Sequence, residues 1–406
     1  MAAVRTTKRR IAASLASTAA VAAVVAALAA PPAQAAAPTG RTGTVLGANS
    51  AQAVPGSYIV TLKEDAGFKA SAQRGKDLVS EYGGTVKRTF TSALNGYAAT
   101  LTAAEARRLA ADPDVASVEQ DQRVHTTGTQ TSAPWGLDRI DQANLPLNGT
   151  YTYPDTAGSG STVYVLDTGV RITHKELAGR ASYGYDFVDN DTTAQDGYGH
   201  GTFVATVTAG STYGVAKKAK IVAVRVLGND GSGTTAGVIA GVDWITANHV
   251  ANSVANVSLG GGASTALDTA VKKSIASGVT YSIAAGNSGA PAANYSPARV
   301  PEALTVGATT STDARASYSN YGSTVDLFAP GSNITAGWNS SDTATYTGNG
   351  TSFAAPHVSG AAALYLTAHP GASPATVSSA LVNGATNNVL TGIGTGSPNK
   401  LLRLVP

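Results

Sequence analysis

The chain has 406 residues and no cysteine, so it can bury hydrophobic cores without disulfides, and zinc–thiolate sites, thiol nucleophiles and redox switches are excluded. Charged residues make up only 13% of the chain and 45 residues are glycine, which is typical of a globular protein with tight turns. The first 37 residues carry a net charge of +4, whereas residues 126–406 carry −2. Residues 126–406 therefore have no positively charged run that could bind a phosphate backbone, and we expect no nucleic-acid partner.

Residues 1–37 have the pattern of a secretory signal peptide. Basic residues between Arg5 and Arg10 are followed by an uncharged, Ala-rich and Val-rich stretch and by the small-residue site Ala33-Gln34-Ala35. This stretch is too weakly apolar for a transmembrane helix. We therefore predict a secreted, extracellular protein that has no membrane attachment after removal of the signal. The pair Arg9-Arg10 leaves both the general secretory route and the twin-arginine route open.

Residues 38–125 predict a small α+β domain, with a compact part at about 57–125. A low-complexity segment, 39–54, precedes it. Alternating residues predict strands, and helical spacing predicts helices, in the order β-α-β-β-α-β that is typical of a ferredoxin-like unit. The expected strands are 57–63, 85–90, 96–101 and 115–119, and the expected helices are 68–82 and 103–111. A polar linker is expected from about His125 to Ala133.

Residues 126–406 predict a large α/β domain. Short apolar strands alternate with helices, which favours a mostly parallel central sheet with helices on both faces. The expected strands are 162–166, 221–227, 256–259, 279–284 and 303–306, and the expected helices are 200–209, 234–252, 263–277 and 352–368. Reactive groups in such sheets gather beyond the carboxyl ends of the strands, where Asp167 and Asn287 lie.

Three polar residues in Gly-rich loops could act together: Asp167, His200 and Ser352. A serine hydroxyl is a weak nucleophile until an imidazole removes its proton, and the imidazole needs a carboxylate to hold its tautomer. Each residue alone also fits a structural role, since Ser before a helix is usually an N-cap and Asp after a strand usually binds turn amides. Spacing leaves His174 and His357 as rival histidines, although His357 lies five residues beyond Ser352 on the same predicted helix and faces elsewhere.

With these three motifs in this order, the chain resembles the subtilisin-like serine proteases, and most of all the proteinase K group, from about Tyr58 to its C-terminus. The order Asp, His, Ser is that of subtilisin. The resemblance implies that Asp167 orients the imidazole, that His200 is the general base and then the general acid, and that Ser352 is the nucleophile. It also implies that the amide of Asn287 binds the oxyanion. An α/β-hydrolase is disfavoured, because Ala354 stands where its Gly-x-Ser-x-Gly motif needs glycine.

The resemblance also implies a substrate groove in which an extended peptide pairs with two segments of the chain. The expected substrate-binding residues are Gly231, Ser232, Gly233, Ser258, Leu259, Gly260, Ala284, Ala285 and Gly286. The expected pocket wall carries no acid that could select Arg or Lys. We therefore expect a broad endopeptidase that prefers aliphatic or aromatic residues before the scissile bond of protein and peptide substrates.

The small domain is similar to an inhibitor-type propeptide, which implies that it assists folding, inhibits the enzyme intramolecularly and is removed autocatalytically near 125–128. The mature enzyme would be about residues 126–406, and we expect it to be a monomer. A permanent regulatory domain is the alternative, which the polar linker disfavours.

Calcium is the expected structural ion, because carboxylates and carbonyls can bind a hard cation where no disulfide is possible. The resemblance aligns Pro301, Ala303 and Asp326 with one site of the proteinase K group. It aligns Asp138 and Asp141, with Gln142 and Asn148, with a site of related thermal and cold-active enzymes. A solvated turn is the alternative for this second cluster.

The chain departs from its relatives after the nucleophile, where Phe353 replaces the usual Met. Because an aromatic ring cannot form a sulfoxide, we expect low sensitivity to peroxide.

Two other functions are compatible with the same fold and motifs. One is an inactive subtilisin-like binding protein, which the presence of all four site residues disfavours. The other is a secreted esterase, which would hydrolyse fatty-acyl esters rather than casein.

Overall fold

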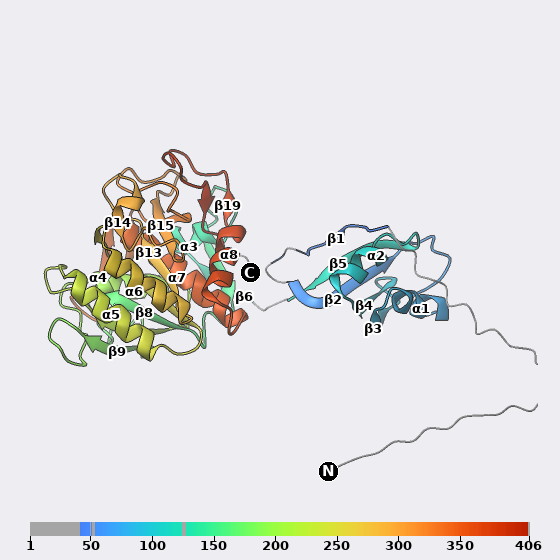
Figure 1. Ribbon diagram of the computed structural model, residues 1–406, viewed down its shortest axis with the longest axis horizontal. Helices are drawn as coiled ribbons and strands as arrows, with labels where there is room; N and C mark the ends of the chain where they lie inside the picture. Colours follow the sequence, from blue (N-terminus) through green and yellow to red (C-terminus); the bar gives the residue numbers. More distant parts are fainter. Residues whose placement is uncertain (1–40, 49, 51–52, 124–126, 405–406) are drawn as a thin grey trace, which may run out of the picture. The chain divides into compact units, whose positions relative to one another are not determined.

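The computed structural model describes residues 41–48, 50, 53–123 and 127–404, which form two compact units that divide between Gln122 and Arg123 (Figure 1). The expected signal peptide, residues 1–37, lies outside the described residues. Within the described ranges, no helix has both the length and the apolar character needed to cross a membrane.

The small unit is a five-stranded sheet with two helices, in the strand order β1-β5-β2-β4-β3. Its elements are β1 (Val45–Leu46), β2 (Ala53–Leu62), α1 (Gln73–Glu81), β3 (Thr85–Phe90), β4 (Gly96–Thr100), α2 (Ala103–Leu109) and β5 (Val115–Gln122). From β2 to β5 they follow the expected β-α-β-β-α-β order. Leu78 and Leu109 of the two helices share one core with Val60 and Tyr97 of the sheet.

Two segments of the small unit differ from the expectation. The segment of low complexity contains β1, which pairs in parallel with β5 at the edge of the sheet. Helix α1 begins at Gln73 and not at Phe68, because the side chain of Asn95 hydrogen-bonds to the backbone of Phe68 and Ala70 and holds these residues in a turn.

The expectation of a polar linker from about His125 to Ala133 is wrong in its described part, whereas His125 lies outside the described residues. Residues Thr127–Thr131 form β6, which pairs antiparallel with β7 (Thr150–Pro154). The segment has the polar composition of a linker because it is an edge strand with exposed threonines, and Thr has a high strand propensity. Its partner strand lies about twenty residues further along the chain, so the local sequence does not reveal the pairing.

The large unit contains a nine-stranded sheet in the order β19-β20-β16-β15-β13-β11-β8-β10-β9. All neighbours are parallel except β19 and β20. The strands are β8 (Thr162–Asp167), β9 (Ala181–Asp186), β10 (Lys220–Arg225), β11 (Ser253–Val257), β13 (Thr280–Ala284), β15 (Leu304–Thr309), β16 (Leu327–Pro330), β19 (Thr386–Asn387) and β20 (Lys400–Leu401). The sequence misses β9, β16, β19 and β20, which are short or lie at an edge and lack a long apolar run.

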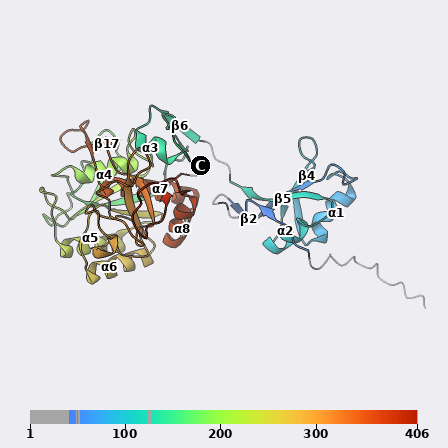
Figure 2. The same ribbon diagram turned by 90° about the horizontal axis from the view of Figure 1, so that it is seen from above.

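Six helices surround this sheet in the described part of the large unit: α3 (Trp135–Ile140), α4 (His200–Ala209), α5 (Thr235–Asn248), α6 (Thr265–Ala276), α7 (Thr351–Ala368) and α8 (Pro374–Gly384). Alternate residues of β8 divide between two cores. Val163 and Val165 pack with α4 and α7, whereas Tyr164 and Leu166 pack with α5 and α6. Figure 2 shows α5 and α6 together on one side of the unit. Helices therefore cover both faces, as expected.

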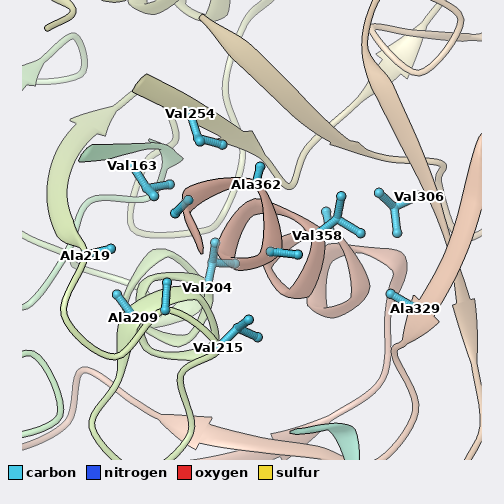
Figure 3. Close-up of a cluster of buried hydrophobic side chains, with 14 of the residues drawn as sticks. Val163, Val204, Ala209, Val215, Ala219, Val254, Val306, Ala329, Val358 and Ala362 are labelled. Atoms are coloured by element: carbon cyan, nitrogen blue, oxygen red, sulfur yellow. The ribbon is translucent and has the colours of Figure 1, made fainter. Parts of the chain in front are cut away.

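Helix α7 runs through the middle of the first core (Figure 3). Its Val358 and Ala362 lie between Val204 of α4 and the sheet residue Val306. Apolar and small residues surround α7 on all sides, and nearly all of its residues are buried. Packing therefore holds the N-terminus of α7, with Ser352, in a constant position relative to the sheet.

Candidate active site

The carboxyl ends of three neighbouring parallel strands bring polar residues together. Asp167 is the last residue of β8, Ser258 follows β11, and Asn287 lies three residues beyond the end of β13. Two helices begin beside this edge of the sheet, α4 with His200 and α7 with Thr351 and Ser352. Segments that lie up to 185 residues apart in the sequence thus contribute to one site.

The imidazole of His200 is hydrogen-bonded to the carboxylate of Asp167, with 2.7 Å between Nδ1 and Oδ1. Asp167 is fully buried, and the backbone N–H of Thr168 donates to the same oxygen. A Cβ on Gly201 would overlap the carbonyl oxygen of Gly169, so glycine is needed for α4 to begin this close to β8. Burial alone would lower the pKa of His200, but the negative charge of Asp167, their hydrogen bond and the charge of Asp196 raise it overall.

Asp196 is a residue that the sequence analysis missed. Its buried carboxylate accepts hydrogen bonds from the hydroxyl of Thr168, from the backbone of Tyr198 and Gly199, and from the backbone and hydroxyl of Thr202. These partners belong to the loop after Asp167 and to the start of α4, so one carboxylate ties the two segments of the Asp–His pair together. No local signal identifies Asp196, because the N-cap position of α4 is Gly199 and Asp196 lies three residues before it in the loop.

The hydroxyl of Ser352 donates to the backbone oxygen of Ser258 at 3.0 Å, and it is not hydrogen-bonded to His200. The hydroxyl of Ser258 in turn donates to the backbone oxygen of Ser352. The ring of the next residue, Phe353, lies 5.7 Å from the ring of His200, measured between centroids. The expected contact between alcohol and imidazole therefore requires a change of the Ser352 rotamer, as is common in structures without substrate.

Asn287 lies beside the start of α7. Its Oδ1 accepts hydrogen bonds from the backbone N–H and the hydroxyl of Thr351. Because Oδ1 is occupied in this way, the Nδ2 group is the part of the amide that remains to donate. The structure thus brings together all four expected catalytic residues: Asp167, His200, Ser352 and Asn287.

The two rival histidines lie outside this group. His174 contacts the backbone oxygen of Ala344 through Nε2 and the backbone N–H of Glu176 through Nδ1. His357 is buried, and its Nδ1 contacts the backbone oxygen of Phe353 on its own helix. Neither is bonded to an acid in the described residues, so of these three candidate histidines His200 is the one with a carboxylate partner.

Two adjoining cavities form a groove along the site. The larger, of about 510 Å³, is lined by His200, Ser258 and the loop that follows β10. The smaller, of about 240 Å³, is lined by Ser352, Asn287 and the end of β13. Leu259, Gly260 and Gly261 line both. The cavity beside Ser352 has no charged residue in its lining, whereas Asp230 lines the larger one.

All of the expected substrate-binding residues line one or both cavities. They are Gly231, Ser232, Gly233, Ser258, Leu259, Gly260, Ala284, Ala285 and Gly286. Tyr198 also lines the larger cavity, with its ring beside Gly231, and it was not among the expected residues. A Tyr next to a Gly-rich loop has no local signal of such a position.

The residues expected to hold calcium have oxygen atoms that could accept a cation. At the first expected site, Asp326 Oδ2 accepts a hydrogen bond from the backbone N–H of Thr305. Burial raises the pKa of Asp326 to about 6, although this hydrogen bond acts to lower it. A carboxylate in such surroundings is stabilised in its charged form by a cation. Pro301 and Ala303, which were expected to share this site through their backbone carbonyls, lie just before Thr305 in the chain.

In the second cluster, Asp141 Oδ1 and Gln142 Oε1 are buried and have no hydrogen-bond partner among the described residues. Burial also raises the pKa of Asp141. Asp138, in contrast, accepts the backbone N–H groups of Asn148 and Gly149 with its two oxygens, and so holds the turn. The unpartnered oxygens of Asp141 and Gln142 are of the type that calcium binds. Within the described residues, no group of three or more acidic or histidine side chains forms a metal cluster.

Both units match known protein families. Residues 158–399 match the subtilase family, and residues 57–127 match the peptidase inhibitor I9 family. The chain is 51% identical over 379 residues to the extracellular serine proteinase of Thermus sp. (strain Rt41A), covering 88% of this chain and 92% of that protein. It is 50% identical to alkaline serine exoprotease A of Vibrio alginolyticus, covering 82% of this chain and 63% of that protein.

A solved structure is similar as well. The crystal structure of a cold adapted subtilisin-like serine proteinase is 54% identical, with a TM-score of 0.66, over 68% of this chain and the whole of that one. Fold and sequence therefore agree on one family.

Proposed function

This chain belongs to the subtilase family and is a serine peptidase with an I9-type inhibitor domain, and we propose that it is secreted and cuts internal peptide bonds through Asp167, His200 and Ser352. The observation that carries the proposal is the 2.7 Å contact between buried Asp167 and His200 at the edge of a groove that also contains Ser352.

Acylation begins when the hydroxyl of Ser352 turns from Ser258 toward Nε2 of His200. Nδ1 donates to Asp167, so Nε2 carries the lone pair that accepts the serine proton. The Ser352 oxygen attacks the carbonyl carbon of the substrate, and the negative oxygen that forms receives hydrogen bonds from the backbone N–H of Ser352 and from Nδ2 of Asn287. The N-terminal end of α7 adds a favourable dipole.

The intermediate collapses when His200 gives its proton to the leaving amine. Water then enters, and His200 removes one of its protons while the water oxygen bonds to the acyl carbon. His200 returns this proton to the Ser352 oxygen as the acyl–oxygen bond breaks, and the product leaves as a carboxylic acid. Asp167 stabilises the imidazolium in both halves of the reaction, and the charge of Asp196 adds to this effect.

The uncharged lining of the cavity beside Ser352 supports a preference for aliphatic or aromatic residues before the scissile bond. Backbone groups of Gly231–Gly233 and Ser258–Gly260 would pair with an extended peptide, which gives affinity with little selectivity. A peptide library tests this preference. Cleavage mainly after Arg or Lys would contradict it.

Residues 38–125 would act as an intramolecular inhibitor and folding aid that the enzyme itself removes. A cut near 125–128 would leave a mature enzyme of about residues 126–406. Because β6 begins at Thr127 and pairs with β7, we place the cut on the N-terminal side of this strand.

Calcium would be held by the backbone oxygens of Pro301 and Ala303 with Asp326, and by Asp141 and Gln142 beside Asp138. The raised pKa of Asp326 and the two unpartnered buried oxygens support these places. The ion would contribute charge compensation and would crosslink loops, and it has no part in the reaction steps above.

The decisive experiment compares wild type, Ser352→Ala and the control Ser277→Ala, which alters an exposed serine at the end of α6. Wild type and the control should process themselves and hydrolyse casein, whereas Ser352→Ala should accumulate as the uncut precursor. Casein hydrolysis by Ser352→Ala, or hydrolysis of a fatty-acyl ester without any of casein, would refute the proposal.

A further inference from the structure

Gly350, the residue before α7, is not required to be glycine by its backbone. Its φ of 164° and ψ of 153° are extended values that any residue adopts. Its surroundings also leave room: the nearest neighbours of an added Cβ would be Ser352 N at 3.6 Å, Asn287 Nδ2 at 3.7 Å and Ser352 Cβ at 3.8 Å. These are ordinary van der Waals distances, so an alanine fits here without displacing other atoms.

Two nearby glycines differ from Gly350 in this respect. A Cβ on Gly348 would lie 2.6 Å from the ring of Phe353, and one on Gly331 would lie 2.5 Å from Cβ of Ala308. Close packing explains these two glycines. At Gly350, the space that a side chain would occupy is bounded by two hydrogen-bond donors instead.

Both of these donors are free. The N–H groups of Thr351 and Phe353, on either side of Ser352, donate to Asn287 Oδ1 and to the Gly350 oxygen, whereas that of Ser352 has no partner among the described residues. The amide of Asn287 is held through Oδ1, and its Nδ2 likewise has no partner in the part of the chain that the structure describes. A point beside Cα of Gly350 is thus within 3.7 Å of two unpaired N–H donors.

We propose that Gly350 is a positioning residue whose missing side chain leaves open the place of the negative oxygen in the tetrahedral intermediate. An oxygen that accepts from both donors lies about 2.7–3.1 Å from each of them. A methyl group at 3.6–3.7 Å from the same two atoms competes for that volume. This inference rests on the proposed function, since it assumes that Ser352 and Asn287 bind the oxyanion.

The test uses Gly350→Ala, Asn287→Ala and the control Gly237→Ala. The Cβ in the control, in the first turn of α5, would also meet only ordinary contacts, the nearest at 3.4 Å. Full chains are processed with immobilised wild-type enzyme, which is then removed. For Gly350→Ala we expect an unchanged melting temperature, a kcat on a peptide amide reduced by about 10²-fold, and a nearly unchanged KM. The control should retain wild-type kinetics.

A second measurement separates loss of the oxyanion place from partial misfolding. A peptide aldehyde forms a tetrahedral adduct with the serine, and this adduct has an oxygen in the place of the oxyanion. The matching peptide alcohol forms no such adduct. We expect Gly350→Ala to bind the aldehyde about 10²-fold more weakly and to bind the alcohol with unchanged affinity. The ratio of the two affinities does not depend on the fraction of the protein that is folded.

The outcomes are distinguishable. A normal aldehyde-to-alcohol ratio in Gly350→Ala, with Asn287→Ala impaired, overturns this inference alone. Normal turnover in Asn287→Ala overturns the oxyanion role in the proposed function. A fall of both ligands' affinities in Gly350→Ala also overturns the inference, since it shows a general disturbance of the groove.

Discussion

The side-chain oxygen of Asn287 accepts two hydrogen bonds from Thr351, from the backbone N–H at 2.8 Å and from the hydroxyl at 2.9 Å. The Thr351 hydroxyl also accepts the backbone N–H of Gly286 at 3.1 Å. The residue before the nucleophile therefore determines which end of the Asn287 amide is free to donate.

Thr351→Val should lower kcat by about 3- to 10-fold, because it removes one hydrogen bond that orients the Asn287 amide while it keeps the side-chain shape. KM should change little. Steady-state kinetics on a peptide amide measures this, with Thr269→Val on the exposed face of α6 as the control. A pure KM effect would contradict the orienting role.

Asp196→Asn should shift the acidic limb of the kcat/KM profile to lower pH. The charges of Asp167 and Asp196 raise the pKa of His200 against burial, so removal of one charge lowers this pKa, and the neutral imidazole then persists to lower pH. Activity at pH 8 should also fall by about 10-fold, because Asn cannot accept all the hydrogen bonds of the carboxylate. Asp243→Asn, on the exposed face of α5, should leave the limb unchanged. A role of Asp196 in packing alone predicts lower activity without any shift of the limb.

His357 should make the folded enzyme sensitive to acid. Burial lowers its pKa to about 4, against the hydrogen bond to the Phe353 oxygen. Between pH 6.5 and 4 the unfolded chain binds a proton that the folded chain excludes, so the free energy of unfolding falls as pH falls, by about 3 kcal/mol for a shift of this size. His357→Gln should lose this part of the pH dependence. Urea unfolding at several pH values, in a Ser352→Ala background that prevents autolysis, measures the difference. Equal slopes for the two proteins would be evidence against it.

Calcium should stabilise the enzyme mainly above pH 6. Without the ion, Asp326 has a pKa raised to about 6 by burial, so the folded chain holds a proton that the unfolded chain releases from about pH 4 upward. The free energy of unfolding therefore falls by about 3 kcal/mol as pH rises through this range. A bound cation removes this loss, because it stabilises the charged form of Asp326. Thermal unfolding with and without calcium, again in Ser352→Ala, tests this. Calcium should raise the melting temperature of Asp326→Asn less than that of the parent. An equal rise in both proteins would exclude Asp326 as a calcium ligand.

Peroxide should inactivate Phe353→Met but spare the wild type. Met1 is the only methionine and the chain has no cysteine, so the catalytic unit has no sulfur to oxidise. The ring of Phe353 packs on Phe203 with 4.1 Å between centroids and lies next to the nucleophile. Leu364→Met, on the same helix and equally buried, is the control. Casein hydrolysis after exposure measures the loss, and rapid inactivation of the wild type would disprove the idea.

Much of the fold could be predicted from local patterns. Apolar runs rich in Val and Ile predicted β8, β10, β11, β13 and β15, and helix α4 begins at His200, as expected. Edge elements could not be predicted in this way. The polar strand β6 is stabilised by pairing with β7, and its composition is that of a linker.

The identities of the site residues also come from the sequence. Asp167, His200, Ser352 and Asn287 each stand in a short motif, and their order along the chain selects the family. The network around them does not follow from such motifs. Asp196 connects two segments, and Asn287 is oriented by a residue 64 positions away.

The sequence by itself determined which chemical groups the protein has and which central strands and helices carry the catalytic ones, because residue type and short-range spacing govern local conformation. Only the tertiary structure decided which donor meets which acceptor: the direction of the Ser352 hydroxyl, the free end of the Asn287 amide and the open space beside Gly350. These depend on the relative placement of distant segments to within an ångström, and that placement results from the packing of α7 and α4 against the whole sheet.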